Sequence, residues 1–407
     1  MVSSSTYNPR LVIWLSLAQL ISWGSVFYLF ALLLAPLERD LGLSRAQVSL
    51  AFSLALLTEG LMAYPVGRWI DRGHERLVMT VGSVLTGLCL ALHSLVSTLA
   101  QLYALWIVLG MAMAAVLYSP AFAVVTRRFP HDFRRAIITL TFLGGLASTV
   151  FIPLIAWLMN HLGWRGMLLC LAALHLLVCA PLHGLVLRGS APAALPHLAH
   201  GPGETHQLVV RQLMRSQPFW LIGLFVTLMM AVTVAIPAHM VSLLRENGLS
   251  ETWVIAMPAA IGAIQVLGRL LLYVFEQRMD VHWVNRWVPA LVPLALLVLL
   301  AAPFLAQWQV LAVGLFVFLY GLGNGLLTIV RGTAIAHYVS RQHMATLNGA
   351  LGLPLALARA AAPLVLGLMW SPRGGYGPGL WLLLALSLLG VAALMLAQHR
   401  SLEHLAP

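Results

Sequence analysis

Lysine is absent from this chain of 407 residues, whose 23 basic residues are all arginine. Charge of either sign is scarce, because Asp and Glu together number 12 and charged residues make up 9% of the sequence, against about 25% in a typical soluble domain. Hydrophobic residues reach 61%. This composition excludes an ordinary soluble domain and predicts an integral membrane protein.

Cysteine is also rare, and its placement excludes further classes of protein. Cys89, Cys170 and Cys179 fall inside apolar runs and no loop holds a pair, so neither a disulfide framework nor a zinc site is indicated. No nucleophile–base arrangement is legible, so we expect neither an enzyme nor a cofactor. The net charge of +11 would suggest nucleic acid as a partner of a soluble protein, but the arginines lie in short tethers between apolar runs and indicate membrane topology instead.

Long apolar runs are what the sequence has in abundance. A transmembrane helix needs about 20 mostly apolar residues, and runs without a charged residue occur at 11–37, 77–126, 136–164, 166–187, 216–244, 287–330 and 374–399. Two of them have double length, and we expect tight turns to divide them at 94–101 and 302–309. Three further spans carry a charge in their interior: 45–67 with Glu59, 251–275 with Arg269 and 343–370 with Arg359. The sequence therefore predicts an all-α integral membrane protein with twelve transmembrane helices.

The distribution of arginines predicts the orientation. With the N-terminus inside the cell, the inner segments hold fifteen arginines and the outer loops five, which is the positive-inside bias. Both termini are therefore expected in the cytoplasm, as in a protein of the bacterial inner membrane. The run at 11–35 is longer than the roughly 7–15 residues of a signal-peptide core, so we expect it to be retained as the first span.

The spans divide six and six around a polar segment. Residues 188–216 are rich in Pro, Gly, Ala and His and predict a linker, with a short amphipathic stretch near 206–215 at the membrane surface. The expected domains are residues 1–187 and 217–407. At an offset of 206 residues, ERDLGLS (38–44) falls on LRENGLS (244–250), and the pairs Trp14/Trp220, Glu59/Gln265 and Arg72/Arg278 coincide. These matches indicate a duplicated six-helix unit, which is typical of transporters.

The loop between the second and third spans reads GRWIDRGHER (67–76). It resembles the loop signature of the major facilitator superfamily, in which a glycine, three residues and Asp-Arg precede further basic residues. The matching residues are Gly67, Asp71, Arg72 and Arg76. The sequence departs from the signature at Gly73, one place early, and at Glu75, where a basic residue is expected. The resemblance implies a glycine that lets helices approach and an Asp–Arg pair that clasps helix ends in one conformation and releases them in another.

Two spans narrow the resemblance within the superfamily. The fifth span lacks the Gly-Pro motif of drug–proton antiporters, has Pro153 at mid-span and ends in GWR (163–165), which is more similar to the monocarboxylate and oxalate/formate porters. The eighth span reads IQVLGRLLLY (264–273). It keeps Arg269 of the D-x-x-x-R pattern of eukaryotic monocarboxylate carriers but has Gln265 at the position of the acid, which puts proton coupling at that position in doubt.

Three arginines inside spans of the C-terminal half are the candidate substrate-binding residues. Arg269 and Arg331 lie about 9 Å from the inner ends of the eighth and tenth spans, and Arg359 lies near the middle of the eleventh. Glu59 is the only acid deep in any span, so these cations suit a carboxylate held by a guanidinium fork. The alternative is that each arginine reaches the membrane surface or bonds the carbonyls of a helix end.

Glu59 is the candidate for proton coupling, because burial favours the protonated form of a carboxyl group. Alternatively, it pairs with an arginine of the other half. His239, near the outer end of the seventh span, is a second candidate, because the unperturbed pKa of histidine lies near neutral pH, although a packing role is the alternative that we favour.

Polar and aromatic residues of the first and fourth spans complete the substrate-binding candidates. Gln19, Trp23 and Tyr28 interrupt an apolar helix, and Tyr118 does so in the fourth span. The resemblance implies that spans one, four, seven and ten line the transport cavity, where these residues would bond or stack on substrate. Aromatic packing is the alternative.

These observations lead to three hypotheses. The first is a monomeric secondary transporter that moves a small organic anion, such as a monocarboxylate, together with protons by rocking two halves around a midplane site. The second is an exporter of drug-like or siderophore-like metabolites. The third is a transition-metal porter, suggested by 15 His and 16 Met, although no His/Met/Cys cluster converges within the spans and His197, His200 and His206 lie in the linker. We expect no bound metal.

Overall fold

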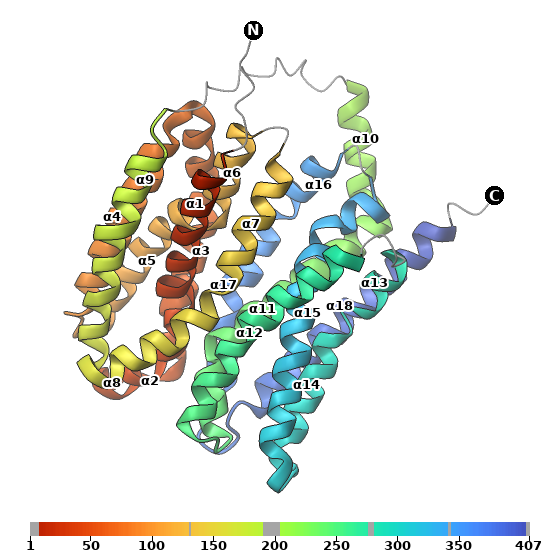
Figure 1. The fold of residues 1–407 in the computed structure, drawn as a ribbon. Coiled ribbons are helices and arrows are strands. Elements are labelled where there is room, and N and C mark those ends of the chain that lie inside the picture. Colours follow the sequence, from red (N-terminus) through yellow and green to blue (C-terminus); the bar gives the residue numbers. More distant parts are fainter. Residues whose placement is uncertain (1–7, 130–131, 190–203, 276–280, 341–342, 404–407) are drawn as a thin grey trace. The chain divides into compact units, whose positions relative to one another are not determined.

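A computed structural model describes residues 8–129, 132–189, 204–275, 281–340 and 343–403. These residues form helices, with one isolated β-bridge between Ser371 and Gly375 (Figure 1). The chain divides into two compact units, Met1–His197 and Leu198–Pro407. Part of the expected linker, residues 190–203 with His197 and His200, lies outside the described residues, as do Arg278 and Arg341 of the expected inner loops.

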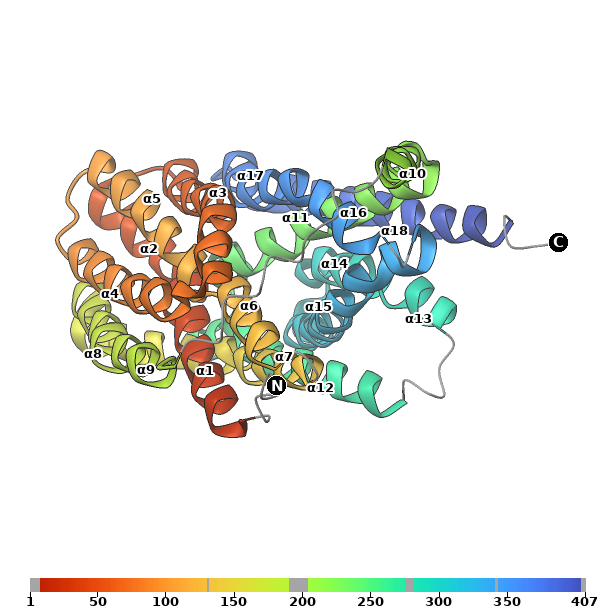
Figure 2. The ribbon, with the colours of Figure 1, turned by 90° about the horizontal axis from the view of Figure 1, so that it is seen from above.

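The first unit contains six spans, some built from several helical segments. In chain order the segments are α1 (Pro9–Ser22), a π-helical turn (Trp23–Tyr28), α2 (Leu29–Leu41), α3 (Arg45–Trp69), a second π-helical turn (Ile70–His74), α4 (Glu75–His93), α5 (Leu99–Val116), α6 (Tyr118–Arg128), α7 (Phe133–Gly145), α8 (Ala147–Leu174), a third π-helical turn (His175–Cys179) and α9 (Ala180–Val186). Helices α4, α8 and α9 pack side by side (Figure 2).

The second unit begins with α10, a short helix that falls in the amphipathic stretch of the expected linker. Its segments are α10 (Glu204–Arg215), α11 (Gln217–Glu246), α12 (Glu251–Phe275), α13 (Val281–Trp287), α14 (Leu291–Ala301), two 3₁₀ turns (Ala302–Phe304 and Ala306–Trp308), α15 (Gln309–Tyr338), α16 (Met344–Ala350), α17 (Gly352–Met369) and α18 (Gly377–Glu403). Both expected helical hairpins are confirmed, because α4 and α5 are divided at 94–98 and α14 and α15 at 302–308.

Ten helical stretches of the described residues are long and apolar enough to cross a membrane. Two of them, Arg45–His93 with 49 residues and Arg135–Val186 with 52, have about twice the length of one span. Each turns at a glycine with positive φ, Gly73 at 90° and Gly163 at 67°, a backbone conformation that side chains with a Cβ rarely adopt. The predicted all-α architecture of twelve membrane helices is therefore confirmed.

The fifth and eleventh spans are each interrupted by one residue between two helices. Leu146 separates α7 from α8, and Leu351 separates α16 from α17. At the second break, Pro354 has no N–H for the carbonyl of Ala350 and its ring opposes a continuous helix. The span expected over 343–370 is therefore built from two helices.

The two units repeat a carboxylate–indole contact at equivalent positions. In the first unit the Trp164 indole nitrogen donates to Oδ2 of Asp40 at 2.7 Å. In the second unit the Trp370 indole donates to both carboxylate oxygens of Glu246, at 3.0 and 2.9 Å. Both pairs are related by the offset of 206 residues, and each ties the end of the unit's first span to the connection that follows its fifth. These contacts support the interpretation of the chain as an internal repeat.

Glycines also bring equivalent helices into contact in each unit. A Cβ on Gly110 of α5 would lie 2.2 Å from the carbonyl oxygen of Ala55 in α3. A Cβ on Gly325 of α15 would lie 2.5 Å from the carbonyl oxygen of Gln265 in α12. The second and fourth spans of each unit therefore pack backbone against backbone, as small residues allow in membrane helices.

Gly110→Ala is expected to lower the melting temperature of the detergent-purified protein by several degrees. The new methyl group meets backbone atoms of Ala55 that cannot rotate away, and overpacking of this kind costs about 1–3 kcal/mol. Gly67→Ala is the control, because no atom lies within 4 Å of a Cβ built there. Equal melting temperatures for the two variants, measured by intrinsic fluorescence, would contradict the close α3–α5 contact.

Candidate functional site

The loop signature lies at the α3–α4 turn of the first unit, where Glu75 is the buried carboxylate. Its side chain has no exposed surface and pairs with Arg127 and Arg128 at the end of α6, each at 2.8 Å. Asp71 and Arg72, which were expected to form the clasp, are exposed, and neither has an ion pair among the described residues. Glu75, which stands where the family signature has a basic residue, is therefore the acid of this network.

Further bonds connect this network to the end of the sixth span. Nη2 of Arg128 donates to the carbonyl of Leu187 at 3.0 Å, and Arg127 donates to the carbonyl of Ile70. Arg76, which belongs to the signature, donates through Nε to the carbonyl of Gly184 at 2.7 Å. We call Glu75, Arg127 and Arg128 the Glu75 cluster. The Glu75 cluster joins three helix ends of the first unit. The only sequence feature that indicated it was the pair of adjacent arginines at 127–128.

The two glycines of the loop have different roles from those expected. No atom of the described residues lies within 4 Å of a Cβ built on Gly67, so the expected close helix approach is absent there. Gly73, the glycine that is one place early, adopts φ 90° at the turn between α3 and α4. The turn therefore depends on Gly73 for its backbone conformation.

The fourth span is broken between Val116 and Tyr118, and a glutamine of the first span bonds to the break. Leu117 is extended, with φ −81° and ψ −163°. Pro120 explains the break, because it has no N–H for the carbonyl of Val116 and its ring clashes with that turn of helix. Nε2 of Gln19, which is fully buried, donates to this carbonyl at 2.8 Å. The first span thereby supplies the hydrogen bond that the carbonyl of Val116 cannot receive within the fourth span.

The predicted aromatic residues of the first unit are partly brought together here. The rings of Trp23 and Tyr118 lie 4.9 Å apart, and Tyr118 stacks on Phe122 at 5.1 Å. Tyr28 makes an edge contact with Phe27, whose ring lies 5.1 Å from that of Trp23. Sequence reasoning thus selected a real contact between the first and fourth spans but did not predict the broken helix beneath it.

Glu59 lies in α3 and is 8% exposed. Helix α3 ends at Trp69, and Glu59 lies ten residues, about 15 Å, before that residue. A carboxylate this deep is expensive in a membrane and is a functional candidate by default.

In the second unit, the guanidinium of Arg331 in α15 faces α11. Its Nη1 lies 3.5 Å from both Oγ1 of Thr233 and Sδ of Met230. Pro237 interrupts the hydrogen bonding of α11 one turn beyond Thr233, and the hydroxyl of Tyr320 donates to the carbonyl of Thr233 at 3.5 Å. The two contacts of Arg331 are weak and neutral, so the protein itself supplies little to balance this charge.

Arg331 lies within electrostatic reach of the other two predicted arginines. Arg331 is repelled by both Arg359 and Arg269. Each lies six or seven residues, about 10 Å, from one end of its helix, and the three ends belong to the same side of the unit. Arg359 lies near the middle of the eleventh span, which runs through α16 and α17 from Met344 to Met369. Arg269 donates through Nε to the carbonyl of Gly325 at 3.3 Å.

We call Arg269, Arg331 and Arg359 the arginine cluster. The sequence has no Asp or Glu from 281 to 402, the acids at the described ends of α11 and α12 are Glu246 and Glu251, and Glu276 and Asp280 lie outside the described residues. Glu246 is bonded to Trp370 and Glu251 to Arg245. Three like charges in a low-dielectric region favour a bound anion, and planar guanidinium groups suit a carboxylate.

His239 does not join the arginine cluster. It is fully buried in α11, where Nδ1 bonds the hydroxyl of Tyr376 at 2.9 Å and Nε2 bonds the carbonyl of Pro363 at 2.9 Å. The two bonds tie α11 to the eleventh span and to the turn before the twelfth. They favour the packing alternative for this residue.

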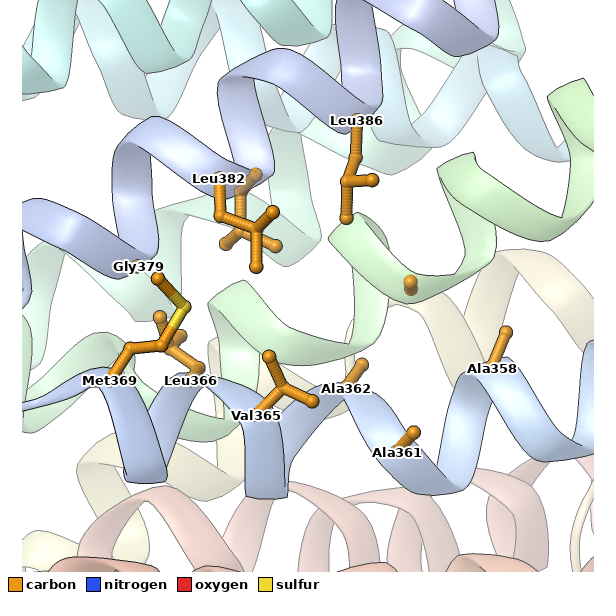
Figure 3. Close-up of a pocket in the computed structure, with 11 residues that line it drawn as sticks. Ala358, Ala361, Ala362, Val365, Leu366, Met369, Gly379, Leu382 and Leu386 are labelled. Carbon is orange, nitrogen blue, oxygen red and sulfur yellow. The ribbon is translucent and has the colours of Figure 1, made fainter.

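An apolar cavity of about 170 Å³ lies between α11, α17 and α18 (Figure 3). Its lining is made of Ala, Val, Leu, Met and Gly side chains, and none of the three arginines contributes to it. The cavity therefore offers no group that would recognise a charged substrate. Among the described residues, no group of three or more His, Cys, Asp or Glu is arranged to hold a metal ion.

Twelve membrane helices in two related six-span units, with three half-buried arginines inside the spans of the second unit, define a multi-pass membrane transporter. The chain belongs to the Major Facilitator Superfamily, whose family model matches residues 15–363.

Two curated relatives and one solved structure refine this assignment. The chain is 34% identical over 189 residues to Monocarboxylate transporter 13 of Bos taurus, a match covering 45% of this chain and 42% of the bovine protein. It is 28% identical over 198 residues to Multidrug resistance protein MdtL of Klebsiella pneumoniae, covering 47% and 49%. Each match thus spans less than half of the relative. A bacterial homolog to the human lysosomal transporter Spinster, in an inward-facing and unoccupied conformation, shares the fold, with a TM-score of 0.73 and 18% identity over 98% of this chain and 99% of that chain.

Proposed function

We propose that this protein is a secondary active transporter of small organic anions, such as monocarboxylates, and that it works by alternating access of two six-helix domains, 1–187 and 217–407, joined by a linker at 188–216. The observation that carries the proposal is the arginine cluster. Arg331 has only long contacts with Met230 and Thr233 and is repelled by Arg359 and Arg269, so a bound carboxylate would stabilise its charge. The name of the bovine relative supports the same substrate class.

The test is uptake of labelled monocarboxylates by the purified protein in liposomes, with and without an inside-alkaline pH gradient. We expect uptake above that of protein-free liposomes, and acceleration by the gradient. Drug-like organic cations form the second arm, because the similarity to MdtL favours an exporter as the second candidate function. Transport of the cations but not of the carboxylates would replace the proposal by that alternative.

Glu59→Gln is expected to abolish the acceleration by the pH gradient while leaving exchange of carboxylate for carboxylate intact. Glutamine keeps the size and the hydrogen bonding of the side chain but cannot carry a proton. The measurement is net uptake with a gradient compared with exchange at equal pH on both sides. Glu246→Gln, at the far end of α11, is the control. Acceleration that survives in Glu59→Gln would remove Glu59 from the proton path.

We further propose a bacterial inner-membrane location with both termini in the cytoplasm, and action as a monomer. The distribution of arginines supports the orientation.

A further inference from the structure

The apolar cavity of the second unit is a groove between α17 and α18 with one open side. Ala361 and Val365 on its α17 wall are exposed, and Leu382 and Leu386 on its α18 wall are half-buried. The labelled side chains of the two helices point toward each other across the groove (Figure 3). None of the described residues that line it has a polar side chain, so a water molecule would find no side-chain partner there. An apolar group is therefore the occupant that the lining favours.

The surface beside the groove is apolar as well. Leu357 and Leu368 of α17 and Trp381 and Leu388 of α18 are exposed. Both helices are long and apolar enough to cross a membrane, and apolar side chains exposed on such helices meet lipid chains. The groove therefore opens from a surface that is suited to lipid.

The length of the groove matches the depth of one leaflet. Its α17 wall runs from Ala358 to Met369, eleven residues apart, which is about 16 Å along the helix. The hydrocarbon core of a bilayer is about 30 Å thick, so one leaflet supplies roughly 15 Å. Met369 is the last residue of α17, and the groove thus begins at the end of the span and reaches toward its middle. One acyl chain of that leaflet can follow it along its whole length.

A single arginine lies at the surface end of the groove. Arg373 is exposed at the tip of the turn 370–376, which connects α17 to α18. The sequence has no other Asp, Glu, Lys or Arg in residues 360–399. At the same turn the carboxylate of Glu246 is bonded to the indole of Trp370. An exposed arginine at a membrane surface attracts the phosphate group of an anionic lipid.

We propose that this groove binds one acyl chain of an anionic phospholipid, with the phosphate group of the lipid beside Arg373. The chain supplies the packing contacts that the walls of an empty groove would lack. The volume of about 170 Å³ is similar to the roughly 150 Å³ of an apolar cavity that holds a benzene molecule, so it accommodates a section of such a chain. In the proposed orientation the lipid belongs to the outer leaflet. The site is separate from the arginine cluster and does not depend on which molecule is transported.

The experiment places the purified full-length protein in liposomes with a trace of phosphatidylglycerol that carries a photoreactive diazirine in one acyl chain. After illumination, the labelled residues are identified by mass spectrometry of peptides. We expect labels on the groove walls of α17 and α18. Ala361→Phe is expected to reduce these labels by about fivefold or more, because the ring takes the volume of the chain. Ala361→Leu is the second variant, and it fills the groove with a smaller side chain if the first variant does not fold.

A matched control and a second lipid complete the design. Ala385 is also an exposed alanine of α18 but does not line the groove, so Ala385→Phe should keep the wild-type labels. The same diazirine on phosphatidylcholine, which has no net charge, should label the groove about fivefold less, the effect of about one basic residue near an anionic surface. Arg373→Gln should remove this difference between the two lipids.

The contradicting outcomes are distinct. Labels on the groove walls that are equally strong in the wild-type protein and in Ala361→Phe overturn the proposal, as do equal labels from the two lipids. Absence of lipid labels in the groove overturns it as well. If a soluble diazirine derivative of benzene labels the groove and the lipid does not, the groove is a site for small apolar molecules instead. Uptake of carboxylates tests the proposed function separately.

Discussion

Arg331→Gln is expected to lower carboxylate uptake in liposomes about 30- to 100-fold without destabilising the protein. A charge-assisted pair of hydrogen bonds between guanidinium and carboxylate contributes about 2–3 kcal/mol or more, which corresponds to this loss. The same charge has only weak contacts with Thr233 and Met230 and is repelled by Arg359 and Arg269. Its removal should therefore leave the melting temperature unchanged or raise it by a few degrees, as is common for residues kept for function.

Two companion variants sharpen this prediction. Arg331→Lys keeps the charge but loses the planar fork, so we expect an intermediate loss of uptake. Arg286→Gln removes an exposed arginine of α13 and should change neither uptake nor stability. A variant Arg331→Gln that transports normally, or one that loses uptake only because it melts several degrees lower, would contradict the binding role of Arg331.

Glu75→Gln is expected to lower the melting temperature by about 5–15 °C. The substitution leaves Arg127 and Arg128 buried without their carboxylate, and removal of one partner of a buried ion pair costs about 3–5 kcal/mol. The measurement is thermal unfolding of the detergent-purified protein at one fixed heating rate, because membrane proteins commonly unfold irreversibly.

The controls for Glu75 come from the same loop and the same cluster. Asp71→Asn, at an exposed position of the family signature, should shift the melting temperature by about 1 °C or less. The double variant Glu75→Gln/Arg128→Met should recover part of the loss, since contacting residues do not act additively. A larger effect of Asp71→Asn than of Glu75→Gln would show that the signature aspartate, and not Glu75, holds the loop.

The twelve spans could be predicted from the sequence because hydrophobicity sums over about 20 residues in each of them. Breaks within spans were harder to predict, although their cause is local. Pro120 and Pro354 each lie three residues after an interruption, and each leaves the carbonyl four residues earlier without its helical hydrogen bond. The pattern of apolar residues continues through both positions, so a search for apolar runs alone passes over them.

The arginines of the candidate site could be predicted from the sequence because a charged residue inside an apolar span is conspicuous. Arg269, Arg331 and Arg359 stand out in apolar spans, and the structure places Arg331 within electrostatic reach of the other two. Contacts between distant residues were not predictable in this way. Glu75 meets Arg128 across 53 residues of chain, and Gln19 meets Val116 across 97.

One long-range signal was present in the sequence but not used. The offset of 206 residues that places Asp40 on Glu246 also places Trp164 on Trp370. Extending the repeat comparison to the tryptophans would have marked both members of each carboxylate–indole pair as repeated positions.

Competition between propanoate and propanamide for the wild-type protein tests the central claim most directly. The two molecules have nearly the same shape and differ in charge, so they report on whether the arginine cluster binds an anion. We predict that propanoate inhibits uptake of a labelled monocarboxylate into liposomes with at least about 30-fold greater potency than propanamide, and that Arg331→Gln removes most of this difference. Equal inhibition by propanoate and propanamide would contradict the account.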